Sequence, residues 1–333
     1  MTDQNATHAF TALPDLAAER VGGAVILAND EFFAEKENLV KAATPVWREG
    51  VYTDRGKWMD GWETRRRREA GFDWCIVRLG MPGFIRGVVV DTAFFTGNYP
   101  EACSLEAAKL QGVPDAATLA AARWVEILPR SPLAGNTRTP FAISSQDEWT
   151  HLRFNIFPDG GVARLRVHGE AVADWDSLLR TGGWIDLGAL AHGGRVVSQS
   201  DAFYGNASNM LQPGRSTHMG DGWETKRRRG AGNDWAIVRL ARPGLVKRVE
   251  LDTDHFRGNA PGWCSLEACI AREDALAAAA WTPILPRTSL QPHARHAFER
   301  EIAAMDKATH IRLSIYPDGG VARLRLLGTP CPV

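Results

Sequence analysis

The sequence predicts an all-β protein built as a tandem duplication of two jelly-roll β-sandwich domains. A long internal repeat indicates the duplication. Residues 60–79 read DGWETRRRREAGFDWCIVRL and residues 221–240 read DGWETKRRRGAGNDWAIVRL, so 16 of the 20 positions match. Short apolar runs rich in β-branched residues, punctuated by Gly and Pro, indicate strands and turns rather than helices. A repeat must be recognised before any local motif is interpreted, because it determines the domain count.

The duplication extends through most of the chain. DTAFFTGNYPEACSLEA begins at residue 91 and DTDHFRGNAPGWCSLEA at residue 252, while THLRFNIFPDGGVARLRVHG near the end of the first copy matches THIRLSIYPDGGVARLRLLG near the end of the second. Each copy is about 150–160 residues long, a normal length for one domain with its own core. We therefore expect a first domain at 10–169, a linker at 170–183 and a second domain at 184–330.

The strands of each copy are predicted from apolar runs between turn residues. WCIVRL (74–79) and FIRGVVVD (84–91) are read as two strands with a turn at Met81-Pro82-Gly83. LRFNIF (152–157) and VARLRV flank PDGG, which is read as a hairpin turn. Helical signal is confined to Ala-rich stretches at 114–122 and 272–280. Many short strands joined by Gly/Pro turns are typical of a sandwich or jelly roll.

Composition excludes several classes of function. The chain is 44% hydrophobic and 23% charged with zero formal net charge, which argues against nucleic acid or an anionic membrane as a partner. No apolar run is long enough to span a bilayer, and the N-terminus lacks a secretory signal pattern. Five cysteines without CxxC spacing favour reduced thiols rather than disulfides or a zinc site. We expect a cytoplasmic protein without a cofactor or bound metal.

The first candidate chemistry lies in the repeated DGWE motif. Glu63 and Glu224 could act as general acid or base beside an apolar wall, with Asp60 and Asp221 as additional groups that bind substrate. The structural alternative is that the aspartates close a turn and the neighbouring Trp62 fills the core.

The second candidate is the basic run at 65–68, repeated at 226–229. Arg is suited to holding a carboxylate through two parallel hydrogen bonds. Charge runs are more often solvated faces, and on a strand alternate members point in opposite directions. At least one arginine in each copy is expected to face a ligand, and the candidates are Arg67, Arg68, Arg228 and Arg229.

The third candidate is the loop that ends in Gly-Asn in both copies. Asn98 and Asn259 could offer amide groups to a substrate, although Gly-Asn is also ordinary turn chemistry. The copies differ at one informative position, where Phe94 of the first corresponds to His255 of the second. His255 is therefore the most asymmetric potential acid or base, although a lone histidine is more often structural.

Together, the motifs DGWETRRRR, DWCIVRLG, VDTAFFTGNYPEACSLEA, ILPRSPL and YPDGGVARLR closely resemble the allantoicase family. The resemblance covers nearly the whole chain in both halves. It implies galactose-binding-like or discoidin-like jelly rolls, a homo-oligomer, and hydrolysis of the small molecule allantoate to ureidoglycolate and urea in purine catabolism through allantoin.

The substrate suggests roles for these residues. Allantoate carries one carboxylate and two ureido groups on a single carbon, so it needs a cationic clamp and groups that bind ureido nitrogens and oxygens. We expect Glu224 and His255 to form the acid–base pair, with Arg228 or Arg229 as the clamp. These expectations make the second copy the better-equipped site.

Glu63, Asn98 and Arg67 are the corresponding first-copy residues. Two alternatives remain open. One is a non-enzymatic tandem galactose-binding-like module that only binds a ligand, since fold analogy alone permits it. The other is an enzyme acting on a related ureido compound.

Overall fold

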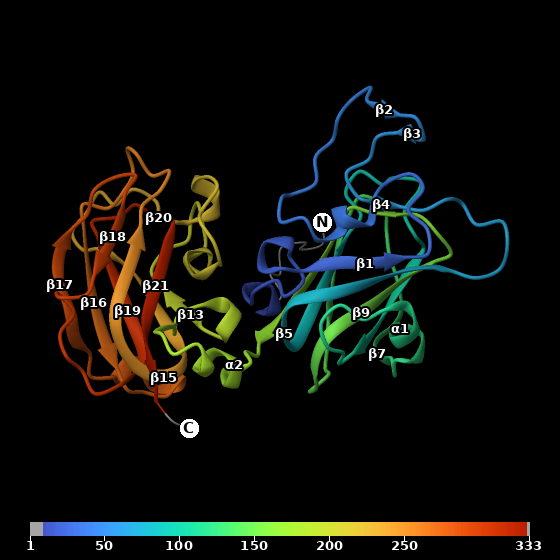
Figure 1. Ribbon diagram of the computed structural model, residues 1–333. Coiled ribbons are helices and arrows are strands. Elements are labelled where there is room, and N and C mark those ends of the chain that lie inside the picture. Colours follow the sequence, from blue (N-terminus) through green and yellow to red (C-terminus); the bar gives the residue numbers. More distant parts are fainter. Residues whose placement is uncertain (1–8, 332–333) are drawn as a thin grey trace. The chain divides into compact units, whose positions relative to one another are not determined.

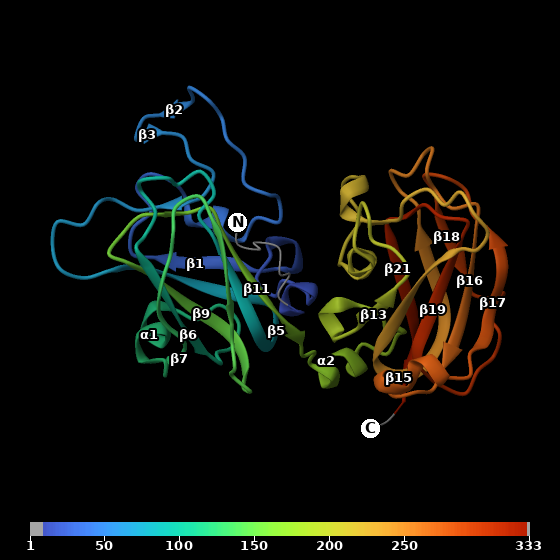
Figure 2. The same cartoon turned by 180° about the vertical axis from the view of Figure 1, so that it is seen from behind.

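The computed structural model describes residues 9–331, which divide into two compact units between Val172 and Ala173. Each unit is an all-β jelly-roll sandwich with only short helical segments (Figures 1 and 2). The segment expected as a linker contains a short helix, α2 (Trp175–Arg180), whose first turn is capped by Asp174. Between residues 9 and 331, every helix falls short of the length and apolar character that crossing a bilayer demands.

The strands of the first repeat are β1 (Ala24–Ala28), β2 (Tyr52–Thr53), β3 (Gly56–Lys57), β4 (Trp62–Glu63), β5 (Asp73–Asp91), β6 (Ala102–Ala108), β7 (Val125–Pro132), β8 (Arg138–Ala142), β9 (Glu148–Phe157), β10 (Gly161–Val162) and β11 (Arg164–Ala171). Its helical segments are η1 (Ala9–Ala12), η2 (Glu19–Val21), η3 (Lys36–Val40) and α1 (Ala116–Ala121).

The strands of the second repeat are β12 (Ile185–Asp186), β13 (Arg195–Gln199), β14 (Trp223–Glu224), β15 (Asp234–Asp252), β16 (Trp263–Cys269), β17 (Thr282–Ser289), β18 (Arg295–Phe298), β19 (Ala308–Tyr316), β20 (Gly320–Val321) and β21 (Arg323–Pro330). Its 3₁₀ segments are η4 (Leu190–His192), η5 (Ala207–Leu211), η6 (Met219–Asp221) and η7 (Glu273–Ala278).

One long strand connects the two layers of each sandwich. The first half of β5 pairs with β1 and β9, and β9 continues the sheet through β6 to β7. The second half of β5 pairs with β11 and β8. In the second repeat, β15 occupies the same position among β13, β19, β21 and β18. All these pairings are antiparallel, as expected when neighbouring strands of a sandwich alternate in direction.

Two expected turns are corrected by the structure. The Met81-Pro82-Gly83 turn is wrong, because β5 runs without a break through these residues and only its pairing with β9 shifts, between Arg78 and Gly83. A Cβ at Gly83 would lie 2.2 Å from the Glu170 carbonyl oxygen, so glycine permits the close backbone approach. The PDGG hairpin is also wrong: β9 pairs with β5 and β6 and β11 with β5, so PDGG connects strands that are not partners.

Buried aromatic rings fix the loops at one end of each sandwich. Trp62 is fully buried and its indole nitrogen donates to the Asp30 carbonyl at 2.8 Å, while Trp223 makes the equivalent bond at 2.9 Å. Phe95 is also fully buried, and a Cβ on Gly161 would lie 1.9 Å from its ring. These contacts hold β4 beside the Gly-Asn loop that follows β5.

The main difference between the repeats is an insertion in the first. Asn38 and Asp60 are 22 positions apart, whereas the equivalent Asn209 and Asp221 are 12 positions apart, so the first repeat has ten extra residues. They carry the small β2–β3 hairpin, which stands out from the sandwich on the side where β4 lies (Figure 1).

Candidate functional site

The loop end of the first repeat brings Glu63 and Asn98 together. Glu63 ends β4, and Asn98 follows the buried Phe95 in the loop after β5. The Asn98 side-chain amide donates to Glu63 Oε1 at 2.7 Å. This contact confirms that the two polar residues lie together, as the sequence suggested, and it leaves Glu63 Oε2 available to a second partner.

A cavity of about 300 Å³ opens beside this pair. Four of the residues that line it are aromatic or apolar and four are polar, so apolar surface is combined with groups that could orient a ligand. The residues that line it are Phe33, Trp47, Lys57, Met59, Glu63, Phe94, Thr96 and Asn98. Burial raises the pKa of the Glu63 carboxyl, and the hydrogen bond from Asn98 opposes this shift only in part. A carboxyl that keeps its proton above the ordinary range is suited to donate that proton to a substrate.

Lys57 is the cation that lines this cavity. Its ammonium group lies 4.1 Å from the centre of the Trp47 ring, and within residues 9–331 it forms no salt bridge. Both residues lie in the segment between Asn38 and Asp60, which is ten residues longer than its counterpart in the second repeat. An ammonium without a carboxylate partner is free to bind an anionic group of a ligand.

The arginine run serves mainly to hold its own loop. Arg67 Nη1 donates to Asp73 at 2.6 Å, and the carboxylate of Asp73 is almost fully buried. Arg228 makes the equivalent ion pair with Asp234. The backbone nitrogen of Arg67 also donates to Asp159 at 2.8 Å. Arg67 and Arg228 are therefore engaged internally rather than directed at the cavity.

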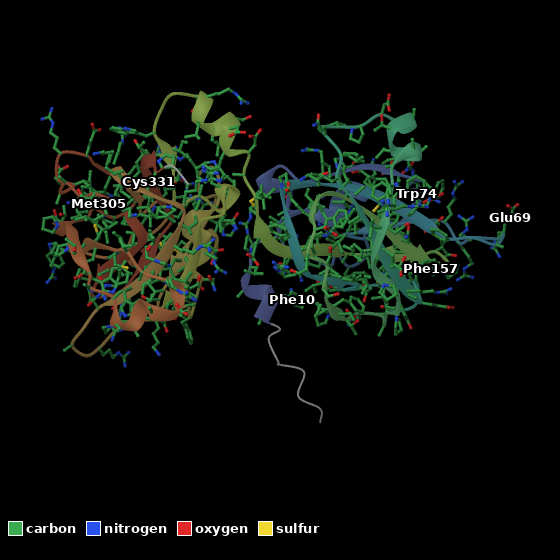
Figure 3. All side chains as sticks on the ribbon, turned by 90° about the horizontal axis from the view of Figure 1, so that it is seen from below. Phe10, Glu69, Trp74, Phe157, Met305 and Cys331 are labelled. Carbon is green, nitrogen blue, oxygen red and sulfur yellow. The ribbon has the colours of Figure 1, made fainter. Side chains whose placement is uncertain are left out.

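Arg68 and Arg229 are exposed. Figure 3 places Glu69, the residue after Arg68, at the far end of a loop that extends away from the sheets of the first repeat. Neither arginine lines the cavity beside Glu63. The expectation that an arginine of this run clamps the ligand thus finds no support in the geometry.

The two aspartates of the DGWE motifs are also structural partners. Asp60 Oδ2 accepts from the buried Arg164 guanidinium at 2.9 Å, and that guanidinium also bonds the Asp60 carbonyl. Asp221 forms the same pair with Arg323 at 2.7 Å. Removing one partner of such a pair leaves a buried charge uncompensated, so both aspartates stabilise the loop end.

The second repeat preserves the carboxyl–amide pair. Asn259 donates to Glu224 Oε1 at 2.6 Å. His255 replaces Phe94, and its Nε2 lies 3.0 Å from the Ser216 carbonyl oxygen. A carbonyl only accepts, so Nε2 carries the proton and Nδ1 of the neutral ring keeps its lone pair.

Other substitutions make the second loop end more ionic. Asp254 stands where the first repeat has Ala93, and it accepts from Arg215 at 2.5 Å. Arg257 stands in place of Thr96, with Nη2 3.2 Å from His293 Nε2. The second repeat therefore offers an exposed guanidinium where the first offers Lys57 from its insertion.

The sequence reasoning missed Lys57 and Trp47. The available signal was the length difference before DGWE, because an insertion in only one copy marks a segment that the shared fold does not need. No group of three or more His, Cys, Asp and Glu side chains suited to a metal is found within residues 9–331.

Known proteins resemble this chain in both sequence and structure. A family model described as the allantoicase repeat matches residues 14–172 and again 185–331. A Nocardia farcinica protein named probable allantoicase is 51% identical over 98% of this chain and 97% of its own length. The Dictyostelium discoideum allantoicase is 48% identical over 97% of this chain and 89% of its own. The crystal structure of Saccharomyces cerevisiae allantoicase superposes with a TM-score of 0.80 at 34% identity, covering 95% of this chain and 93% of the other.

Proposed function

Because the chain belongs to the allantoicase family, we propose that it hydrolyses allantoate to ureidoglycolate and urea in the first-repeat cavity. The observation that carries this placement is the half-buried Glu63 carboxyl, hydrogen-bonded by Asn98 in a cavity that also holds Lys57, a cation without a carboxylate partner among residues 9–331. This reaction belongs to purine catabolism through allantoin. It makes the protein a hydrolase of carbon–nitrogen bonds other than peptide bonds.

The lining of the cavity matches the groups of allantoate. The ammonium of Lys57 binds the substrate carboxylate, replacing the arginine clamp expected from the sequence. Asn98 and Glu63 bind one ureido group through its oxygen and nitrogens. Trp47 and Phe94 form apolar walls that limit the access of water and strengthen these polar contacts.

The reaction replaces a carbon–nitrogen bond with a carbon–oxygen bond at the central carbon. The Glu63 carboxyl donates its proton to the ureido nitrogen that leaves as urea. The carboxylate so formed then takes a proton from the water that adds to the central carbon, which regenerates the acid and yields ureidoglycolate. One carboxyl thus serves as acid and then as base, a role for which a raised pKa is suited.

Glu224 and His255 remain a prediction for the second repeat. Support comes from the lone pair on His255 Nδ1 and from the Glu224–Asn259 bond, which parallels the first repeat. Arg257 would bind the substrate carboxylate there. If catalysis lies in the second repeat instead of the first, His255 would act as the base.

The setting proposed for the enzyme is a cytoplasmic homo-oligomer. All five cysteines are free thiols, four of them buried, which suits a reducing compartment. Oligomerisation rests on the family resemblance. Neither nucleic acid nor a membrane is proposed as a partner.

Urea release from allantoate tests the function directly. The purified full chain should release urea and ureidoglycolate, with and without a chelator. Ureidoglycolate offered as the substrate should give no glyoxylate above the blank. Folded protein that releases no urea under either condition would support the binding-module alternative. Rapid formation of glyoxylate would indicate the related ureido substrate instead.

A further inference from the structure

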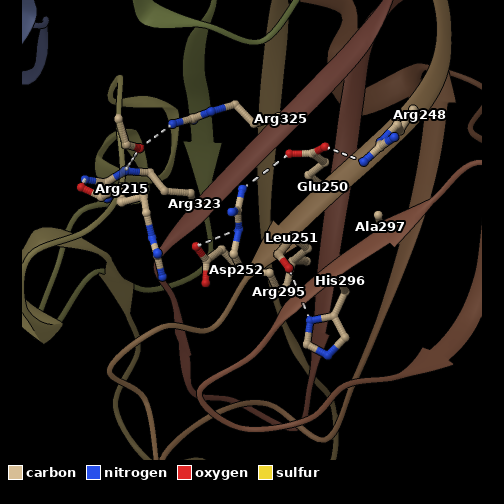
Figure 4. Close-up of a pocket in the computed structure, with 11 residues that line it drawn as sticks. Arg215, Arg248, Glu250, Leu251, Asp252, Arg295, His296, Ala297, Arg323 and Arg325 are labelled. Carbon is tan, nitrogen blue, oxygen red and sulfur yellow. Dashed lines mark hydrogen bonds and ion pairs between the residues drawn. The ribbon is translucent and has the colours of Figure 1, made fainter.

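A second cavity, of about 250 Å³, lies in the second repeat, and neither Glu224 nor Asn259 lines it (Figure 4). Five arginines and two carboxylates contribute to its wall. The residues that line it are Gly214, Arg215, Arg248, Glu250, Leu251, Asp252, Arg295, His296, Ala297, Arg323 and Arg325. It forms across three neighbouring strands, because Glu250 of β15 stands opposite Ala297 of β18 and Arg325 of β21.

The first repeat shows that this charge is not needed by the fold. Arg248, Glu250 and Asp252 alternate along one face of β15. The same register on β5 places Gly87, Val89 and Asp91 at these positions, since Asp91 and Asp252 stand opposite the equivalent arginines of β11 and β21. A jelly roll with the same topology therefore forms with glycine and valine there.

In the first repeat this face is closed by an apolar side chain. A Cβ on Gly87 would lie 2.4 Å from the ring of Phe10, so the ring packs directly on the glycine. Val89 is buried as well. The second repeat thus carries Arg248 and Glu250 where the first has Gly87 and Val89 in apolar packing.

Arg295 forms two long ion pairs and no short one. Its guanidinium lies 3.8 Å from Glu250 and 3.8 Å from Asp252, beyond hydrogen-bond range, and Figure 4 shows it between these two carboxylates. Arg323, by contrast, is tied to Asp221 at 2.7 Å, and Arg248 bonds Glu250 at 2.8 Å. Arg295 is 58% exposed, so a ligand can reach it.

We propose that this cavity binds a small acid that also carries N–H donors, of the ureido-acid or amino-acid class. The ligand carboxylate would pair bidentately with Arg295, while its N–H groups would donate to Glu250 and Asp252. A simple oxyanion fits less well, because it has no N–H group to donate to Glu250 and Asp252. The volume corresponds to about eight water molecules, enough for a ligand of similar atom count. This site does not depend on the proposed catalytic cavity.

Isothermal titration calorimetry of the full chain with N-carbamoylglycine tests the proposal. The titrations use Lys57→Met protein, in which the cation of the catalytic cavity is absent. We expect saturable binding. It should weaken at least about 10-fold when Arg295→Gln is combined with Lys57→Met, since a hydrogen bond to a charged group contributes about 1.5–3 kcal/mol. Arg138→Gln is the matched control: Arg138 lies 3.7 Å from Asp91 in the first repeat, and its loss should leave binding unchanged.

Further ligands and one double variant separate the remaining outcomes. Acetate and urea should each bind far more weakly than N-carbamoylglycine. Comparing the affinity of glycine with that of N-carbamoylglycine shows whether the cavity prefers an amino acid or a ureido acid. Arg248→Gly with Glu250→Val installs the residues of the first repeat and should abolish binding in a folded protein that still turns over allantoate when Lys57 is intact. Unchanged affinity in Arg295→Gln, or tighter binding of inorganic phosphate than of N-carbamoylglycine, would overturn the proposal.

Discussion

The two loop ends contain the same carboxyl–amide pair in different surroundings. Glu63 and Asn98 face an aromatic cavity whose cation comes from an insertion, whereas Glu224 and Asn259 share their loop end with histidine and arginine. The duplication has preserved the geometry of the pair while its electrostatic neighbours have changed. The carboxyl–amide pair is therefore common to both repeats, and the residues around it make the chemistry of the two copies different.

The position of Phe94 and His255 shows that backbone and side chain are under separate constraints. Both residues adopt a left-handed conformation, with φ of 69° and 71°, which is uncommon for residues other than glycine. In each copy a side chain from another loop accepts from the strained backbone nitrogen: Asn136 Oδ1 for Phe94 and His293 Nδ1 for His255. The fold requires the conformation, and it accepts either an aromatic or a titratable side chain there.

The largest expected effect distinguishes the two carboxyls. Glu63→Gln should lower kcat for allantoate by about 10²–10⁴-fold, because the variant cannot donate or take the proton. Glu224→Gln, which is isosteric and keeps the bond from Asn259, is the matched control. If only the first repeat is catalytic, Glu224→Gln turns over allantoate within about threefold of the wild type. The reverse pattern would move the active site to the second repeat, and two large losses would show that both pairs are needed.

The next effect distinguishes the two cations. Lys57→Met should raise KM for allantoate by about 10- to 100-fold, with a smaller change in kcat, because it removes a charged hydrogen-bond donor to the substrate carboxylate. Lys57→Arg should recover most of the affinity. Arg257→Met is the comparison in the second repeat and should leave KM close to the wild-type value. A KM that does not respond to Lys57→Met would remove this residue from the site.

The pH dependence of the reaction sharpens the comparison further. Burial raises the pKa of Glu63, and the acid form is the one that donates the proton. The value of kcat/KM should therefore be level below this pKa and fall about tenfold per pH unit above it, with the midpoint above the ordinary carboxyl range. Asn98→Leu removes a bond that favours the charged carboxylate, so it should move the alkaline limb to higher pH. A shift to lower pH would contradict the assignment of Glu63 as the acid.

Local patterns in the sequence were enough to predict the architecture and one part of the site. The repeat and the strand-length apolar runs predicted two jelly rolls, because alternation and turn chemistry are local properties. Glu63 stood out as a carboxyl beside Trp62 in the repeated DGWE motif, and Asn98 as the amide of the Gly-Asn turn that follows Phe95. Their hydrogen bond follows from the packing of those rings.

The remaining features depend on the path of the chain in three dimensions. Asp73 pairs with Arg67 rather than with its neighbours because of the course of the loop, which a run of four arginines does not reveal. Lys57 reaches the cavity only because the insertion turns back over it. The continuous β5 strand was missed because Gly83 resembles a turn residue in sequence but serves a close backbone contact.

The smallest expected effect comes from exchanging the residues that distinguish the two loop ends. His255→Phe installs the first-repeat side chain at a position whose backbone already tolerates it, so the protein should fold. If catalysis belongs to the first repeat, kcat should change by less than about threefold, well short of the loss expected for a general base. Phe94→His is the reciprocal change, and it should reduce turnover more because it replaces an apolar wall of the cavity beside Glu63. Steady-state kinetics and urea denaturation of both variants separate a catalytic loss from a loss of stability. A fall of 10²-fold or more in His255→Phe, with unchanged stability, would restore the histidine to the reaction and assign catalysis to the second repeat.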